Sequence, residues 1–119
     1  HSSSTIEVIH QLKYFIVERP RTARRFIKTT NPPVSIQELN IIEFEKGNNN
    51  SEQKVIEWLE LGLNVGVISE SGMPGIADPG HSVVLMAHNN NFKVKSLIGP
   101  SSVSLALSAS GLNGQSFAF

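Results

Sequence analysis

The residues best suited to bind a ligand form a loop rich in glycine and proline in the second half of the chain. Residues 69–80 contain three glycines and two prolines, and they directly follow the apolar run 65–68. Glycine lets main-chain N–H and C=O groups come close to a ligand, and α/β sheets bind ligands beyond the carboxyl ends of their strands. The loop is therefore the first candidate for a functional site. A plain structural turn is the alternative, since Gly-Pro loops commonly separate elements.

A second loop of the same kind follows the apolar run 94–98. Gly99 and Pro100 end that run, and Ser101 and Ser102 then open a predicted helix of small and apolar residues over 102–110. The free N–H groups and the positive dipole end of a helix N-terminus bind polar ligands. An ordinary N-cap would also explain a serine at this place. Two successive units of strand, glycine loop and helix predict one composite site.

Three motifs together resemble a known family. The loop SESGMPGIADPG, the turn GPSS at 99–102 and the segment LSASGL at 107–112 are similar to the tetrapyrrole methylases, which are S-adenosylmethionine-dependent methyltransferases. The resemblance is closest to the branch that methylates ribose 2′-hydroxyls of small-subunit ribosomal RNA. It implies S-adenosylmethionine as the cofactor. The residues that it places beside the cofactor are Gly72, Met73, Pro74, Ile76, Ser101 and Ser102.

A cluster of three arginines suits contact with RNA phosphates. Arg21, Arg24 and Arg25 occupy adjoining positions on the surface of a helix predicted over 21–29. Guanidinium groups bind phosphate oxygens in a bidentate manner, and a solvated helix face is the alternative. The RNA-modifying branch has Glu-Asp-Thr-Arg here, of which Glu18 and Arg21 match while Arg-Pro stands in the middle. We expect these arginines to bind the RNA substrate.

The composition limits which other functions fit. With 119 residues and 39% hydrophobic content, the chain can form one domain with a core. The formal net charge is zero, so any RNA contact must be local. There is no cysteine, and the four histidines do not cluster with carboxylates, so we expect no disulfide, thiolate nucleophile or metal site. No apolar run reaches the roughly 18 residues of a membrane span, and a soluble, cytoplasmic protein without a membrane partner is expected.

Hydrophobic periodicity and turn residues predict alternating helices and strands. Helices are expected over 5–13, 21–29, 51–61, 81–88 and 102–110, with a capping box and a short helical turn at 35–38. Strands are expected over 14–17, 41–45, 65–68 and 94–98. This order predicts an α/β fold with a mainly parallel sheet and helices on both faces. The resemblance makes it the amino-terminal domain of a tetrapyrrole methylase-like fold.

The expected organisation is a single domain over residues 1–119, and the resemblance implies that a first strand and a second domain lie outside this chain. The expected activity is S-adenosylmethionine-dependent methyl transfer to a ribose 2′-hydroxyl of ribosomal RNA, without a metal. A corrin or porphyrin methyltransferase of the same fold and a non-catalytic binding module are the alternatives. The apolar stub that contains Phe117 and Phe119 predicts self-association, so a homodimer is expected.

Overall fold

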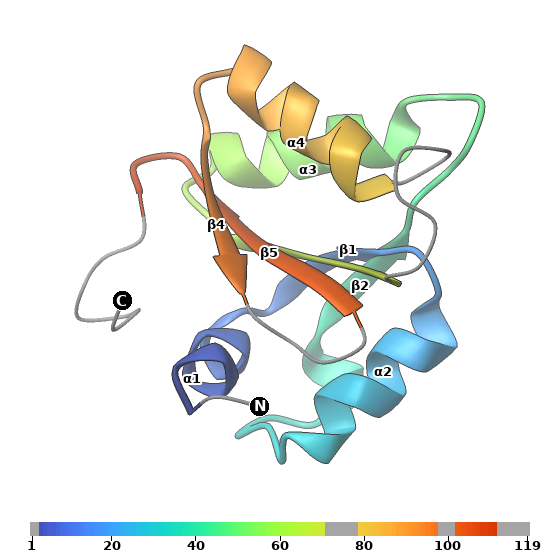
Figure 1. Cartoon of the computed structure of the whole chain (residues 1–119), viewed down its shortest axis with the longest axis vertical. Coiled ribbons are helices and arrows are strands. Elements are labelled where there is room, and N and C mark those ends of the chain that lie inside the picture. Colours follow the sequence, from blue (N-terminus) through green and yellow to red (C-terminus); the bar gives the residue numbers. More distant parts are fainter. Residues whose placement is uncertain (1–2, 71–78, 98–101, 112–119) are drawn as a thin grey trace.

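The computed structural model describes residues 3–70, 79–97 and 102–111, which form a five-stranded sheet between two layers of helices (Figure 1). The helices are α1 (Ser3–Gln11), α2 (Pro20–Thr29), α3 (Asn50–Glu60) and α4 (Pro79–Asn89), and a 3₁₀ turn, η1 (Ile36–Glu38), precedes the second strand. The strands are β1 (Tyr14–Val17), β2 (Asn40–Glu43), β3 (Val65–Glu70), β4 (Lys93–Leu97) and β5 (Ser102–Ser108). The predicted elements before residue 98 are confirmed, including the capping box between Ser35 and Glu38.

The strands lie in the order β2-β1-β3-β5-β4. β1 pairs in parallel with β2 and β3, whereas β5 pairs antiparallel with both β3 and β4. Four strands therefore run in one direction and β5 runs against them. The predicted α/β fold, with a mainly parallel sheet and helices on both faces, is confirmed with this one reversed strand.

The prediction of a helix over 102–110 is wrong, because residues Ser102–Ser108 form strand β5. This strand pairs with β3 on one side and with β4 on the other. Leu105 and Leu107 enter the core on one face of the sheet, and Ala106 enters the core on the opposite face. Pairing on both sides and burial on both faces outweigh the weak local preference of a short run of serine, alanine and leucine.

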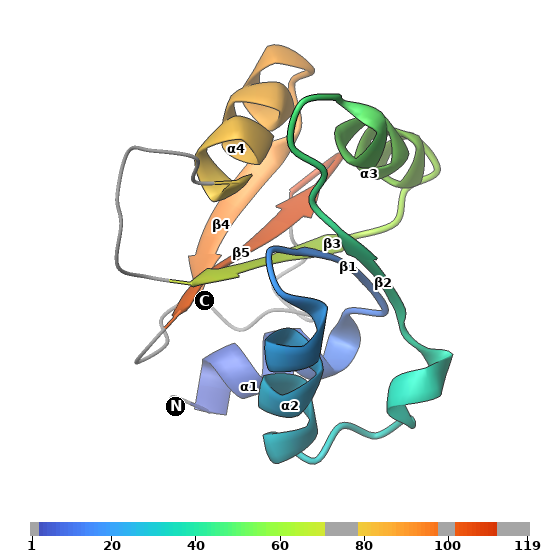
Figure 2. The same cartoon turned by 90° about the vertical axis from the view of Figure 1, so that its right-hand side faces the viewer.

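Side chains alternate along the strands and fill a core on each side of the sheet. α1 and α2 cover one face, and α3 and α4 cover the other (Figures 1 and 2). In β1, Phe15 and Val17 pack with α1 and α2, whereas Ile16 packs with α3 and α4. The rings of Tyr14 and Trp58 join β1 to α3 with their centroids 5.1 Å apart. The sheet is thus held rigidly between two apolar layers.

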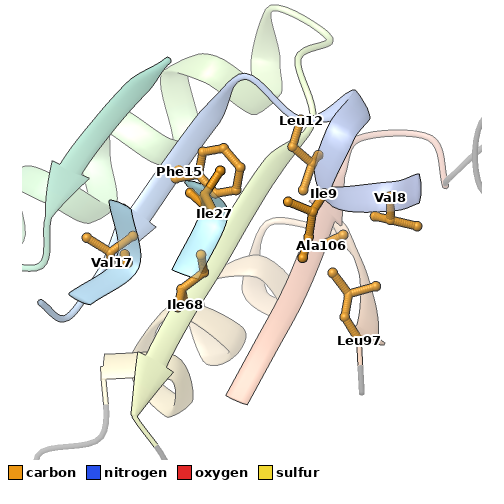
Figure 3. Close-up of a cluster of buried hydrophobic side chains, with 10 residues drawn as sticks. Val8, Ile9, Leu12, Phe15, Val17, Ile27, Ile68, Leu97 and Ala106 are labelled. Carbon is orange, nitrogen blue, oxygen red and sulfur yellow. The ribbon is translucent and has the colours of Figure 1, made fainter. Parts of the chain in front are cut away.

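Two small residues form the floor on which α1 packs. Gly66 of β3 and Ala106 of β5 are cross-strand partners, and Ala106 lies beside α1 in the first core (Figure 3). A Cβ atom at Gly66 would lie 2.6 Å from Cδ2 of Phe15 and 3.1 Å from Cδ1 of Leu12. The first distance is well inside van der Waals contact, so only glycine permits this close packing.

The helix α2 is fixed to its neighbours along its length. Pro20 occupies its first turn, where the constrained φ of proline suits a helix start. At its other end, Nε2 of His10 in α1 lies 2.8 Å from the carbonyl oxygen of Thr30. Ala23 and Ile27 are buried against the sheet. The helix therefore presents a fixed face to the core and a fixed face to solvent, and His10 has a structural role.

Candidate functional site

The strands β1, β3 and β4 all end at the same edge of the sheet, and β5 begins there. The Cα atoms of Glu70, the last residue of β3, and of Ser102, the first residue of β5, are register partners. The hydrogen bonding between β1 and β3 continues one residue past the end of β1, since the N–H of Glu18 donates to the carbonyl oxygen of Ile68 over 3.0 Å. We call this the carboxyl edge. It is the edge at which α/β sheets bind ligands.

Both predicted ligand loops connect to the carboxyl edge. Residues 71–78 follow the end of β3, and residues 98–101 join the end of β4 to the start of β5. The structure therefore brings the connections of the two loops together, as a composite site requires. The predicted cofactor residues that lie outside the described residues are Gly72, Met73, Pro74, Ile76 and Ser101.

Ser102 has a setting that differs from the predicted one. It opens strand β5 and not a helix, so the dipole and the free N–H groups of a helix N-terminus do not act there. Its position at the carboxyl edge, opposite Glu70, still places its backbone beside the end of β3. A contact between Ser102 and the cofactor stays a prediction, and it now depends on this sheet position alone.

The structure adds Ser69 to the candidate residues at the carboxyl edge. Its side chain is 1% exposed, and its Oγ has no hydrogen-bond partner within the described part of the chain. A buried polar group without a partner costs about 1–3 kcal/mol, and a polar ligand that reached this hydroxyl would recover that cost. The sequence places Ser69 at the start of the loop, because the apolar run ends at Ile68. Its pairing with Val103 shows that β3 continues through it.

The three predicted arginines lie on the solvent side of α2. Arg21, Arg24 and Arg25 are exposed, whereas Ala23 and Ile27 of the same helix are buried. The helix contains no acidic residue. Because α2 begins shortly after β1 ends, its first turn lies near the carboxyl edge (Figure 2). The structure thus gathers the three guanidinium groups on one helix that starts close to the candidate cofactor site.

Lys28 extends this row, although the sequence motifs do not point to it. It is exposed and lies one helical turn beyond Arg24 and Arg25. Residues three and four apart are neighbours on a helix surface. The spacing 21, 24, 25, 28 therefore indicates that Lys28 lies on the same face as the three arginines. We call these four residues the cationic face. Its side chains offer hydrogen-bond donors and positive charge to phosphate groups.

Two further features concern the described residues only. No group of three or more histidine, aspartate or glutamate side chains in 3–70, 79–97 and 102–111 is placed to hold a metal ion. None of the four described helices has the length and apolar character needed to cross a bilayer.

A comparison with protein families decides the relationship of this chain. The family model of the tetrapyrrole (corrin/porphyrin) methylases matches residues 5–118. The chain belongs to this family. The matched region includes both glycine loops and α2, so the resemblance of the motifs is confirmed. The five-stranded α/β sheet with helices on both faces is the fold with which this tetrapyrrole methylase chain positions its candidate site.

Three relatives of this tetrapyrrole methylase chain are each named ribosomal RNA small subunit methyltransferase I. The protein of Vibrio cholerae is 39% identical over 79 residues, which cover 64% of this chain and 27% of the relative. That of Helicobacter pylori is 30% identical over 123 residues, covering 95% and 43%. That of Bacillus subtilis is 37% identical over 75 residues, covering 63% and 26%. The chain therefore spans less than half the length of these relatives.

Proposed function

We propose that this protein is an S-adenosylmethionine-dependent methyltransferase whose acceptor is a ribose 2′-hydroxyl of small-subunit ribosomal RNA. Membership of the tetrapyrrole methylases carries the proposal, together with the two predicted cofactor loops that connect to one carboxyl edge. The name shared by the relatives, ribosomal RNA small subunit methyltransferase I, favours RNA over a tetrapyrrole as the acceptor.

The cofactor is assigned to the carboxyl edge. Backbone groups of the first loop hold its methionyl part beside an apolar wall, and the second loop borders its adenosine. The residues assigned to these contacts are Gly72, Met73, Pro74, Ile76, Ser101 and Ser102. The buried hydroxyl of Ser69 supports this assignment, because it has no partner among the described residues and such groups normally find one.

The reaction needs positioning more than activation by the protein. S-adenosylmethionine supplies a methyl group that its sulfonium already activates. The residues of the chain hold the acceptor hydroxyl in line with the methyl carbon, keep water out, and take up the hydroxyl proton as the carbon–oxygen bond forms. A rigid sheet edge between two packed helical layers suits this task, because small displacements of the reacting groups cost rate.

The RNA is assigned to the helix α2. Arg21, Arg24 and Arg25 point to solvent on a helix without acidic residues, and guanidinium groups bind phosphates well. Phosphate contacts position an RNA without reading its sequence. The choice of the methylated nucleotide therefore has to come from the shape of the acceptor and from other parts of the protein.

A homodimer in the cytoplasm completes the proposal, and Phe117 and Phe119, from which the sequence predicts self-association, lie outside the described residues. Leu61 and Leu85 are large hydrophobic side chains with 75% and 50% of their surface exposed, and both belong to the α3 and α4 layer. We place the dimer contact on this layer, on the opposite side of the sheet from α2. Sedimentation velocity tests it. We expect Leu85→Glu to shift the equilibrium toward monomer, and an unchanged distribution would remove this face as the contact.

The direct test of the activity incubates the full protein with small ribosomal subunits and with S-adenosylmethionine that is labelled on its methyl group. We expect the label in a 2′-O-methyl nucleoside after digestion of the RNA. A second arm supplies a corrin or porphyrin acceptor. Labelling of that acceptor and not of RNA would overturn the proposed acceptor. Absence of binding to S-adenosylhomocysteine would instead favour a non-catalytic module.

A further inference from the structure

We infer that α2 is a track for the sugar-phosphate backbone of the RNA, that Lys28 is its fourth cation, and that the track leads toward the carboxyl edge. The inference rests on the proposed function and adds to it how the RNA lies on the protein. It is carried by the spacing of the cationic face, by the distribution of charge over the chain, and by the direction of α2.

The spacing of the cationic face matches a linear polyanion. Arg21 and Lys28 are seven residues apart, which is about 10 Å along a helix axis. Arg24 and Arg25 lie between them, and all four side chains are exposed. The phosphates of one strand are spaced about 3.4 Å apart along the axis of a DNA duplex, so a row of this length reaches more than one phosphate. A compact anion would engage only one end of it.

The charge of the chain is strongly segregated. Five of its ten lysines and arginines lie between Arg19 and Lys28, a stretch without an acidic residue, which leaves five basic and ten acidic residues in the rest of the chain. The helix α3, on the opposite face of the sheet, carries three glutamates and one lysine. A polyanion is therefore attracted to α2 itself, whereas Glu7 of α1 and Glu38 of η1 place exposed negative charge elsewhere on the same side of the sheet. A neutral net charge hides this local concentration of positive charge.

The direction of α2 gives the track a near end and a far end. The helix starts beside the carboxyl edge, after β1, and the chain returns from its far end through η1 to Asn40, whose N–H donates to the carbonyl oxygen of Lys13 at the start of β1. Arg21 is thus the cation of the track nearest the carboxyl edge, and Lys28 is the farthest. An RNA strand on the track approaches the cofactor site at Arg21.

The track is also rigid before RNA binds. Ala23 and Ile27 anchor α2 in the core, and the contact from His10 to Thr30 holds its last turn to α1. Binding therefore requires ordering of the cationic side chains but not of the helix. This keeps the entropic cost of association low.

The experiment measures how the affinity for small-subunit ribosomal RNA depends on salt. The variants are Lys28→Gln, Arg24→Gln with Arg25→Gln, and all three together, and Lys93→Gln is the matched control because Lys93 is an exposed lysine on β4. Each phosphate contact contributes about 0.7 to the slope of log K against log salt for a single strand. We expect the triple variant to reduce the slope by about 2 and Lys28→Gln to reduce it by about 0.7. Lys93→Gln should leave the slope unchanged.

Two companion measurements separate the track from folding and from the proposed activity. Thermal unfolding and calorimetry with S-adenosylhomocysteine should give the same result for all variants and the wild type. Lys28→Gln behaving like Lys93→Gln would overturn the four-cation track. Normal methyl transfer with an unchanged salt slope in the triple variant would overturn it altogether. A steep slope that depends on α2 in a protein that transfers no methyl group would leave the track standing and refute the proposed function.

Discussion

The two halves of the sheet differ in how their strands are specified. In the half formed by β2, β1 and β3, each strand has its own apolar sequence, such as the Tyr-Phe-Ile-Val of β1, and the strands run in parallel. In the other half, β5 consists of serine, alanine, valine and leucine and runs antiparallel to both of its neighbours. The first kind of strand is recognisable from its own residues. The second is defined by the strands that flank it.

The polar content of the two halves shows the same difference. Among the described residues, three buried serine hydroxyls have no hydrogen-bond partner, and two of them, Ser104 and Ser108, belong to β5. The third, Ser69, lies on β3 next to β5. Buried unpaired hydroxyls destabilise a fold. Backbone pairing and the buried leucines therefore stabilise the β5 half, and its unpaired serine hydroxyls destabilise it.

The largest expected effect tests whether β5 contributes to the core as fully as the parallel strands do. Leu107 is fully buried and is the register partner of Val65, so Leu107→Ala should lower the free energy of unfolding by about 2–5 kcal/mol. Urea denaturation measures this, with Leu59→Ala in α3 as the benchmark for a fully buried leucine. A loss below about 1 kcal/mol, when Leu59→Ala loses several, would show that β5 is not a packed strand.

A smaller effect is expected in the parallel half, from overpacking. Gly66→Ala places a methyl group 2.6 Å from Cδ2 of Phe15, which should cost about 1–3 kcal/mol of stability. Phe15→Leu replaces the aromatic ring by a smaller side chain, so it should relieve the clash and recover part of that loss in the double variant. A double-mutant cycle measures the coupling between the two positions. Additive effects of the two substitutions would mean that the floor beneath α1 is not tight at this point.

The smallest effect has the opposite sign. Ser104→Ala removes a buried hydroxyl without a partner, so stability should rise by about 1 kcal/mol. Ser51→Ala is the control, because Ser51 is equally buried but its Oγ accepts a hydrogen bond from the N–H of Glu45 over 3.1 Å. The control should lose stability. If both substitutions destabilise the protein alike, Ser104 has a partner in solution and the contrast between the two halves is weaker than the structure indicates.

The sequence predicts the fold well wherever a segment carries its own signal. The strand patterns, the capping box at Ser35 and Glu38 and the exposed arginines of α2 all depend on residues near one another in the chain. The predicted helix over 102–110 is instead strand β5, because the conformation of these residues depends on pairing with β3 and β4. The need for glycine at position 66 is likewise set by Phe15 and Leu12, which are distant in sequence.

The candidate site divides along the same line. The motifs predict the two loops, and the family match confirms the relationship that they indicate. The sequence does not predict that a further strand, β5, begins between the ends of β3 and β4, or that Ser69 is buried there without a partner among the described residues. Both depend on the long-range pairing of strands.

The central claim is that S-adenosylmethionine binds at the carboxyl edge. Titration of the isotope-labelled protein with S-adenosylhomocysteine, followed by amide chemical shifts, tests it most directly. Shifts should change at Glu18, Glu70 and Ser102 and stay constant at Lys13 and Lys93, which lie at the other edge of the sheet.

The matched variant for this titration is Gly72→Val, which denies close approach of the loop backbone and any positive φ. We expect it to abolish the shift changes while the unliganded spectrum keeps the dispersion of the wild type. Shift changes confined to Lys13 and Lys93, or a Gly72→Val protein that binds S-adenosylhomocysteine as the wild type does, would contradict the account.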